Sequence, residues 1–186
     1  MVWLTALAIG LVGGLATGGK IGNLARLRFR WPWLLSAALV VRAATILPPF
    51  ARLDASRWAY VAALTVVLAW TIWHIDRLPG IWLVAAGSAI NLFVIAANLG
   101  RMPVAPELAG ALVQRGQVGQ YTVMGPGTQL NWLADWIALP GPLGGVLREA
   151  YSPGDLIAAL GIAVVVLLAM RARPHETRRR IVSDPP

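Results

Sequence analysis

The feature that most constrains this chain is a series of long apolar blocks separated by short segments rich in proline, glycine or charge. Several blocks approach the ~17 to 25 residues that a membrane-spanning helix needs, and they lack the alternation of barrel strands. The composition agrees, because 58% of the residues are hydrophobic and 13% are charged, whereas soluble domains carry roughly a quarter charged residues. We therefore expect an all-α, polytopic helical membrane protein.

The apolar blocks predict about five transmembrane helices, at residues 2–18, 32–47, 58–75, 80–100 and 153–170. The third and fourth are joined by HIDRLPG, whose Asp, Pro and Gly are typical of a tight turn. These two helices should form an antiparallel pair. Residues 101–152 then form a long loop, and residues 171–186 form an arginine-rich tail.

The basic residues predict the orientation. Five spans place the larger set of them on one side of the membrane: Lys20, Arg26, Arg28, Arg30, Arg77, Arg171, Arg173, Arg178, Arg179 and Arg180. Arg52, Arg57, Arg101, Arg115 and Arg148 fall on the other side. Because cytoplasmic flanks retain Lys and Arg, we expect a multi-pass protein of the bacterial inner membrane with its N-terminus outside and its C-terminus inside. The net charge of +8 then reflects topology and does not indicate a nucleic-acid partner.

The outer loop, 101–152, is too long to be a simple connection. PELAGALVQR, residues 106–115, predicts a short helix that begins at a proline. In TQLNWLADWIALPGP, residues 128–142, the large apolar side chains recur at helical spacing. We expect this second segment to be an interfacial helix on the outer leaflet.

Arg42 lies inside the second predicted span, where a guanidinium costs at least ~2.5 kcal/mol on insertion scales. It lies in the outer half of that span, so it either snorkels toward the outer surface or pairs structurally. The alternative is an anion or head-group site under the outer loop, with Asp135 or Asp155 as counter-ion. In YSPGDLI, Ser152, Pro153 and Asp155 also match a helix start, so structure alone accounts for Asp155.

Polar residues also occur near the end of the fourth span. Asn91 and Asn98 share one helical face, which predicts either helix-to-helix hydrogen bonds or a polar cavity near Arg42. In NLGRMP, Gly100 fits the left-handed position after a helix and Pro103 prevents its continuation. A helix stop does not specify Asn98 or Arg101, so both join the candidate polar site.

The first span carries Gly10, Gly14 and Gly18 at four-residue spacing, which predicts a smooth face for close helix packing. Its neighbour is either another span of this chain or a separate subunit, including a second copy of the chain. No metal or cofactor is indicated: the chain has no cysteine, and His74 and Asp76 are too few for a metal cage and fit a surface turn. No sequence motif of a known catalytic type is recognisable either.

NLGRMPV, LNWLADWIALP and YSPGDLIAALGI occur in this order, and with them the chain resembles a family of small bacterial integral membrane proteins of unknown function. Its signature falls on Asn98, Gly100, Met102 and Pro103, and its later motifs fall on Leu133 with Asp135 and on Ser152, Gly154 and Asp155. Leu99 stands where glycine is common. The resemblance implies a membrane fold, and it implies no activity because the family has none assigned.

Three functions follow as expectations. The first is a non-enzymatic accessory or interaction subunit, because the chain combines a glycine-faced helix with no catalytic constellation. The second is a carrier for a small solute or a lipid head group, built on a polar site between the second and fourth spans. The third is a membrane-embedded enzyme on lipid-linked substrates, which requires Asp135 or Asp155 beside Arg42.

Overall fold

The computed structural model describes residues 2–45, 47–51, 53–114, 119–139 and 149–172. Five long helices dominate it: α1 (Val2–Ala16), α2 (Pro32–Ala44), α4 (Asp54–Trp73), α5 (Ile81–Ala97) and α7 (Pro153–Arg171). They fall on the five apolar blocks, which confirms a mostly helical fold. Short pieces connect them, namely the 3-10 helix η1 (Ile21–Arg26) and the one-turn helix α3 (Pro48–Ala51).

Length separates these helices into two groups. Only α4 and α7, of 20 and 19 residues, are long and apolar enough to cross a membrane, among the helices that the structure describes. The other three are apolar but shorter; the 13 residues of α2 rise only ~20 Å at helical pitch, against a hydrocarbon core of about 30 Å. Length and composition therefore support two membrane-crossing helices and not yet five.

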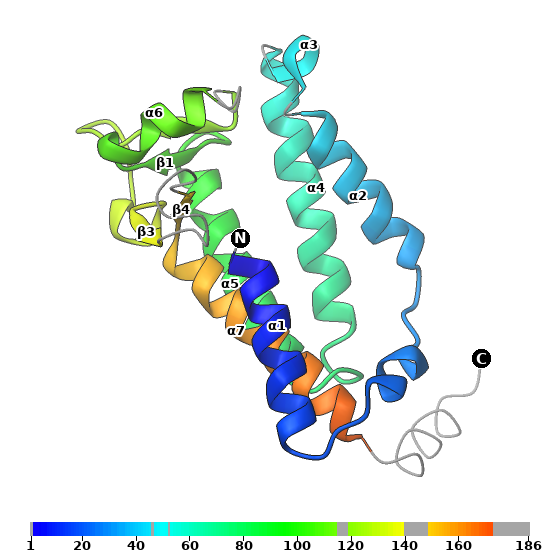
Figure 1. Cartoon of the computed structure of the whole chain (residues 1–186). Coiled ribbons are helices and arrows are strands. Elements are labelled where there is room, and N and C mark those ends of the chain that lie inside the picture. The colour runs from blue at the N-terminus through cyan, green and yellow to red at the C-terminus, as the bar shows by residue number, and fades with distance from the viewer. Residues whose placement is uncertain (1, 46, 52, 115–118, 140–148, 173–186) are drawn as a thin grey trace.

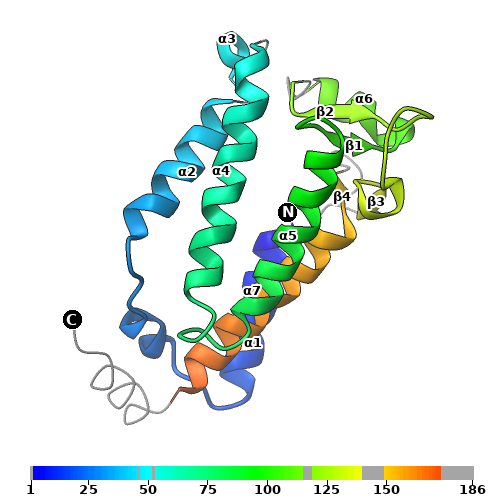
Figure 2. The same ribbon diagram turned by 180° about the vertical axis from the view of Figure 1, so that it is seen from behind.

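The helices pack in the spatial order α1, α7, α5, α4, α2, with contacts between each successive pair. The last helix along the chain thus lies between the first and α5. Figures 1 and 2 show that α2 and α4 form one pair and that α1, α5 and α7 form a second group. The α4–α5 turn joins the two groups, which diverge toward the end that carries the outer loop.

Glycine permits the closest crossings. A Cβ at Gly10 would lie 2.7 Å from the carbonyl oxygen of Ala163, and one at Gly14 would lie 2.5 Å from the sulfur of Met170. The glycine face of α1 therefore packs on α7 of the same chain. The prediction for Gly18 is wrong: it follows the helix in a left-handed turn (φ +79°), and a Cβ there would meet nothing within 4 Å.

The outer loop is built from short strands as well as helix α6 (Pro106–Gln114), whose position confirms the predicted short helix. Strand β1 (Met102–Val104) pairs in parallel with β2 (Tyr121–Val123). Strand β3 (Ile137–Leu139) pairs antiparallel with β4 (Glu149–Tyr151). None of these strands was expected.

The predicted interfacial helix at residues 128–142 is wrong over the part that the structure describes, and residues 140–142 lie outside it. A single 3-10 turn, η2 (Asn131–Leu133), is followed by β3. Leu130 adopts a left-handed conformation (φ 57°) and Ala134 is extended, so a helix cannot continue through them. Asp135 instead pairs with Val104 in a parallel bridge.

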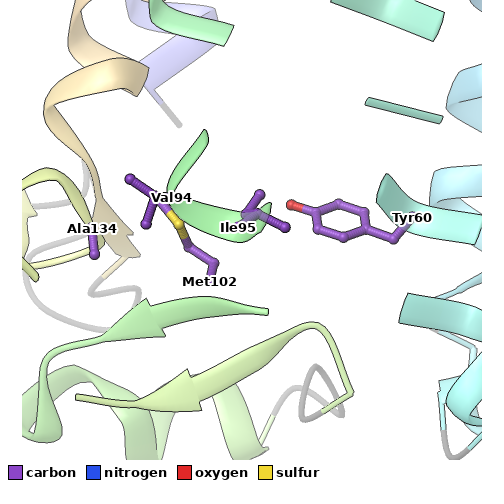
Figure 3. Packing of buried hydrophobic residues seen from close by; sticks show 5 residues of the cluster. All are labelled: Tyr60, Val94, Ile95, Met102 and Ala134. Carbon is purple, nitrogen blue, oxygen red and sulfur yellow. The ribbon is translucent and has the colours of Figure 1, made fainter. Parts of the chain in front are cut away.

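A hydrophobic cluster joins the loop to the helices. Tyr60 of α4, Val94 and Ile95 of α5, Met102 of β1, and Ala134 form it, and in Figure 3 the Tyr60 hydroxyl points toward Ile95. The outer loop is therefore anchored on the ends of α4 and α5. This cluster positions the polar residues described below.

The opposite end of α4 is held by His74, which is fully buried and so is not part of a plain surface turn. Its Nε2 accepts a hydrogen bond from the Arg30 backbone N–H at 3.1 Å, so Nδ1 carries the proton and donates to the Trp70 carbonyl oxygen at 2.8 Å. Trp70 in turn donates from Nε1 to the Arg30 carbonyl oxygen at 2.9 Å. These bonds tie the segment before α2 to α4.

Candidate functional site

The candidate site begins at the first turn of α7. Ser152 and Asp155 form the predicted capping box: Ser152 Oγ accepts from the Asp155 N–H at 2.9 Å, and Asp155 Oδ2 accepts from the Ser152 N–H at 3.2 Å. Asn91 of α5 binds both residues. Its Nδ2 donates to Asp155 Oδ1 at 2.8 Å, and its Oδ1 accepts from Ser152 Oγ at 2.7 Å.

Gly154 permits this arrangement. A Cβ at Gly154 would lie 2.1 Å from Oδ1 of Asn91 and 2.7 Å from the carbonyl oxygen of Gly87. The start of α7 thus approaches α5 so closely that a side chain at position 154 would not fit. The Asn91 amide is fixed against the Asp155 carboxylate as a result.

Arg42 reaches this network from α2. Its guanidinium lies beside the buried Tyr60 hydroxyl, and its charge interacts with Asp155 and with Tyr121 of β2. Arg42 itself is exposed, although Tyr60 is only 5% exposed. The cation therefore stands at an accessible edge of a buried polar cluster, which agrees with pairing and not with snorkelling alone.

Asp135 is held beside the cluster by its backbone. Its N–H donates to the Pro103 carbonyl oxygen at 3.0 Å, and its carbonyl oxygen accepts from the Ala105 N–H at 2.9 Å. The residue is 6% exposed, and its Oδ1 has no hydrogen-bond partner among the described residues. Burial, and secondly the charge of Asp155, raises the pKa of Asp135 to about 8, so the carboxyl is largely protonated at neutral pH.

The loop closes the site through Gln120 and Tyr121. Gln120 Nε2 donates to Thr45 Oγ1 just beyond α2, and Thr45 Oγ1 donates to the Arg42 carbonyl oxygen at 2.7 Å. The next residue after Gln120 is Tyr121, and burial is the main cause that raises the pKa of its hydroxyl. The charges of Tyr60 and Asp135 raise the pKa further. The outer loop therefore contacts both helix groups, on α2 and on α5.

Two predicted site residues have other positions. Asn98 fastens the loop to the end of α5: its Nδ2 donates to the carbonyl oxygens of Val94 and Gln129 at 2.8 and 2.9 Å, and its Oδ1 accepts from the Gln129 N–H at 2.8 Å. Arg101 lies just before β1, and its Nε is buried without a partner among the residues described. Asn98 is thus structural, and Arg101 belongs to a different part of the surface.

The structure thus brings together four of the six predicted residues, namely Arg42, Asn91, Asp135 and Asp155. It adds Tyr60, Tyr121, Gln120 and Thr45, which the sequence did not single out. Tyr60 lies in the second turn of α4, and its neighbours in the sequence form no pattern with it. Thr45 ends α2, three residues after Arg42. The folded loop brings Gln120 to Thr45 and Tyr121 near Arg42, and neither contact leaves a pattern in the sequence.

The cluster combines an exposed guanidinium, two phenol hydroxyls, an ordered amide and two carboxyl groups. It supplies donors for an anion and acceptors for a hydroxyl or ammonium group. Among the described residues no group of three or more His, Asp or Glu is placed to hold a metal ion.

Comparison with known proteins gives a family and no activity. Residues 26–167 match the model of a family of unknown function, DUF5317, so the chain belongs to that family. No curated protein and no solved structure matches the chain.

Proposed function

We propose that this member of the family is an integral protein of the bacterial inner membrane with five membrane-embedded helices and a cytoplasmic C-terminus. Beyond the length of α4 and α7, the support is the exposure of apolar side chains on a short helix. Leu4, Ile9 and Val12 of α1 are each more than 60% exposed. A helix that is apolar on its outer face needs an apolar surrounding, and lipid supplies one.

We further propose that the protein binds a polar head group beneath its outer loop, as a carrier or receptor for a small solute or a lipid. The observation that carries this proposal is the exposed Arg42 next to the buried Tyr60 hydroxyl, within reach of the charge of Asp155. A guanidinium suits a phosphate or carboxylate. The carboxyl groups of Asp135 and Asp155 suit a hydroxyl or amine on the same ligand.

A membrane-embedded enzyme acting on lipid-linked substrates is the second candidate. Asp135 favours it, because a buried carboxyl with a pKa of about 8 is suited to general acid–base work near neutral pH. Arg42 would bind the anionic part of the substrate. The two candidates share one binding site and differ in whether the ligand leaves chemically changed.

An accessory or interaction role, the first expectation from the sequence, has lost its main motive, because Gly10 and Gly14 pack on α7 of the same chain. A partner would have to use another face. Leu39 and Val40 of α2 are exposed at 49% and 68% and would offer one, although such side chains also suit lipid.

The decisive test replaces Arg42 by Ala, with Arg28→Ala as a control for the loss of an exposed arginine elsewhere. Each protein is purified in mild detergent, and native mass spectrometry records binding of a panel of anionic and zwitterionic lipids and solutes. The proposal expects a ligand that binds to the wild type and to Arg28→Ala and is lost in Arg42→Ala at unchanged expression. Equal binding by Arg42→Ala, or no binding of any panel member to the wild type, would refute it.

Turnover of the bound ligand separates the two candidates. If the purified protein converts a lipid-linked ligand and Asp135→Asn binds it without conversion, the protein is an enzyme. If the ligand is recovered unchanged, the carrier proposal stands.

A further inference from the structure

Two further arginines, Arg57 and Arg101, lie near the start of α4. Arg57 is in the first turns of α4, and Arg101 follows the turn that ends α5. Gly100, with φ +84°, places the backbone next to Arg101 against the Arg57 stem: a Cβ at Gly100 would lie 3.7 Å from Cγ and 3.8 Å from Cβ of Arg57. Two residues distant in sequence thus present like charges from adjacent backbone.

Both guanidinium groups contain a nitrogen without an acceptor among the described residues. The Nε atoms of Arg57 and Arg101 are buried and have no hydrogen-bond partner in the described part of the chain. Asp54 lies 3.9 Å from a terminal nitrogen of Arg57, but its side chain is 86% exposed, so solvent screens this contact. The Trp58 ring, 5.6 Å from the Arg57 guanidinium carbon, offers a π-face and not a lone pair.

A buried donor without an acceptor costs about 1 to 3 kcal/mol, and an anion bound by both arginines would supply the acceptors. We propose that Arg57 and Arg101 together bind a phosphate group. Guanidinium forks match the oxygens of phosphate in paired hydrogen bonds, and the Nε atoms that lack partners are part of those forks. The site uses neither Arg42 nor the carboxyl groups of the first cluster.

The surroundings indicate where the phosphate comes from. Leu53 and Trp58 beside the pair are 53% and 52% exposed, and a tryptophan at this level is typical of the zone of lipid head groups. An anionic lipid and soluble phosphate share the required chemistry. The experiment therefore offers both.

Purified full-length protein in dodecyl maltoside is titrated with inorganic phosphate and, separately, with a short-chain phosphatidic acid, and calorimetry records binding. A short-chain diacylglycerol controls for the acyl chains. Arg57→Gln and Arg101→Gln should each weaken binding by about tenfold or more, the usual loss for a hydrogen bond to a charged group. Arg28→Gln should bind as the wild type does.

Binding of both probes identifies a general phosphate site, and binding of phosphatidic acid alone identifies a lipid site. Failure of both probes, or wild-type affinity in Arg57→Gln and Arg101→Gln, overturns the proposal.

A further variant guards against misfolding of the arginine substitutions. Asp54→Asn removes the acid that competes for Arg57, and it should tighten phosphate binding by about twofold to threefold, as expected for a screened surface pair. If Arg57 and Arg101 were purely structural, Asp54→Asn would leave the affinity for phosphate unchanged. Weaker binding in Asp54→Asn would also contradict the proposal.

Discussion

Asp135 gives the sharpest test of the outer loop, because its carboxyl is buried while its backbone is fixed by β1. Replacement by Asn keeps the shape of the side chain and removes its ionisation. Below the pKa of the unfolded chain the wild-type carboxyl is protonated in both states, so the two proteins should have similar stability there. At higher pH they should diverge.

The direction and size of this stability difference follow from the pKa of Asp135. Burial raises the pKa of Asp135 from 3.8 to about 8, so between these values the folded state holds a proton that the unfolded state releases. Stability therefore falls as pH rises through this window. About four pKa units at 1.36 kcal/mol per unit give a ceiling of ~6 kcal/mol, and relaxation of the loop around the ionised carboxylate reduces this to a few kcal/mol.

Thermal unfolding of both proteins in detergent at pH 5, 7 and 9 measures the effect. The difference between Asp135→Asn and the wild type cancels other titrating groups, and we expect it to favour the variant increasingly from pH 5 to pH 9. A difference that stays constant with pH would refute the argument. So would a wild type that gains stability relative to Asp135→Asn as pH rises, because that would mean a paired carboxylate.

Three further predictions concern packing and the ends of the helices. Gly87→Ala should destabilise the protein by about 3 kcal/mol, because the new Cβ would lie 2.3 Å from the Gly154 carbonyl oxygen. Gly110→Ala should stabilise it by about 0.5 to 1 kcal/mol, because a Cβ at Gly110 meets nothing within 4 Å. Thermal unfolding midpoints equal to that of the wild type would contradict both predictions. His74→Phe removes one buried and one partly buried hydrogen bond and should lower stability by roughly 1 to 3 kcal/mol; an unchanged unfolding midpoint would show that these bonds contribute nothing. Asn98→Ala should loosen the loop and raise amide hydrogen exchange at residues 128–131 without changing exchange within α4; unaltered exchange at the loop would exclude the fastening role.

The helices were predictable because each is encoded locally. Apolar blocks and breakers located all five long helices, and the S-P-G-D pattern gave the capping box of Ser152 and Asp155, because both act within a few residues. The first turns of α4 were missed: Asp54 precedes the apolar residues that mark the span. Charged residues at a helix start weaken the hydrophobic signal.

The outer loop was not predictable in the same way. The spacing of Leu130, Leu133, Trp136 and Ile137 fits a helix, but the backbone at Asp135 is used by β1, some thirty residues earlier in the chain. A long-range pairing of this kind leaves no local signal. The burial of His74 depends in the same way on Arg30, 44 residues away.

The packing of α1 on α7 sets an order of assembly. Lys20 N–H and Asn23 Nδ2 both donate to the Met170 carbonyl oxygen, at 2.9 and 2.8 Å, and the Val2 N–H donates to the Tyr151 hydroxyl at 3.0 Å. During synthesis α1 leaves the ribosome first, yet the helix that covers its glycine face leaves it last. The glycine face of α1 therefore has no native neighbour until α7 has been made, so the contacts between α1 and α7 form late in folding.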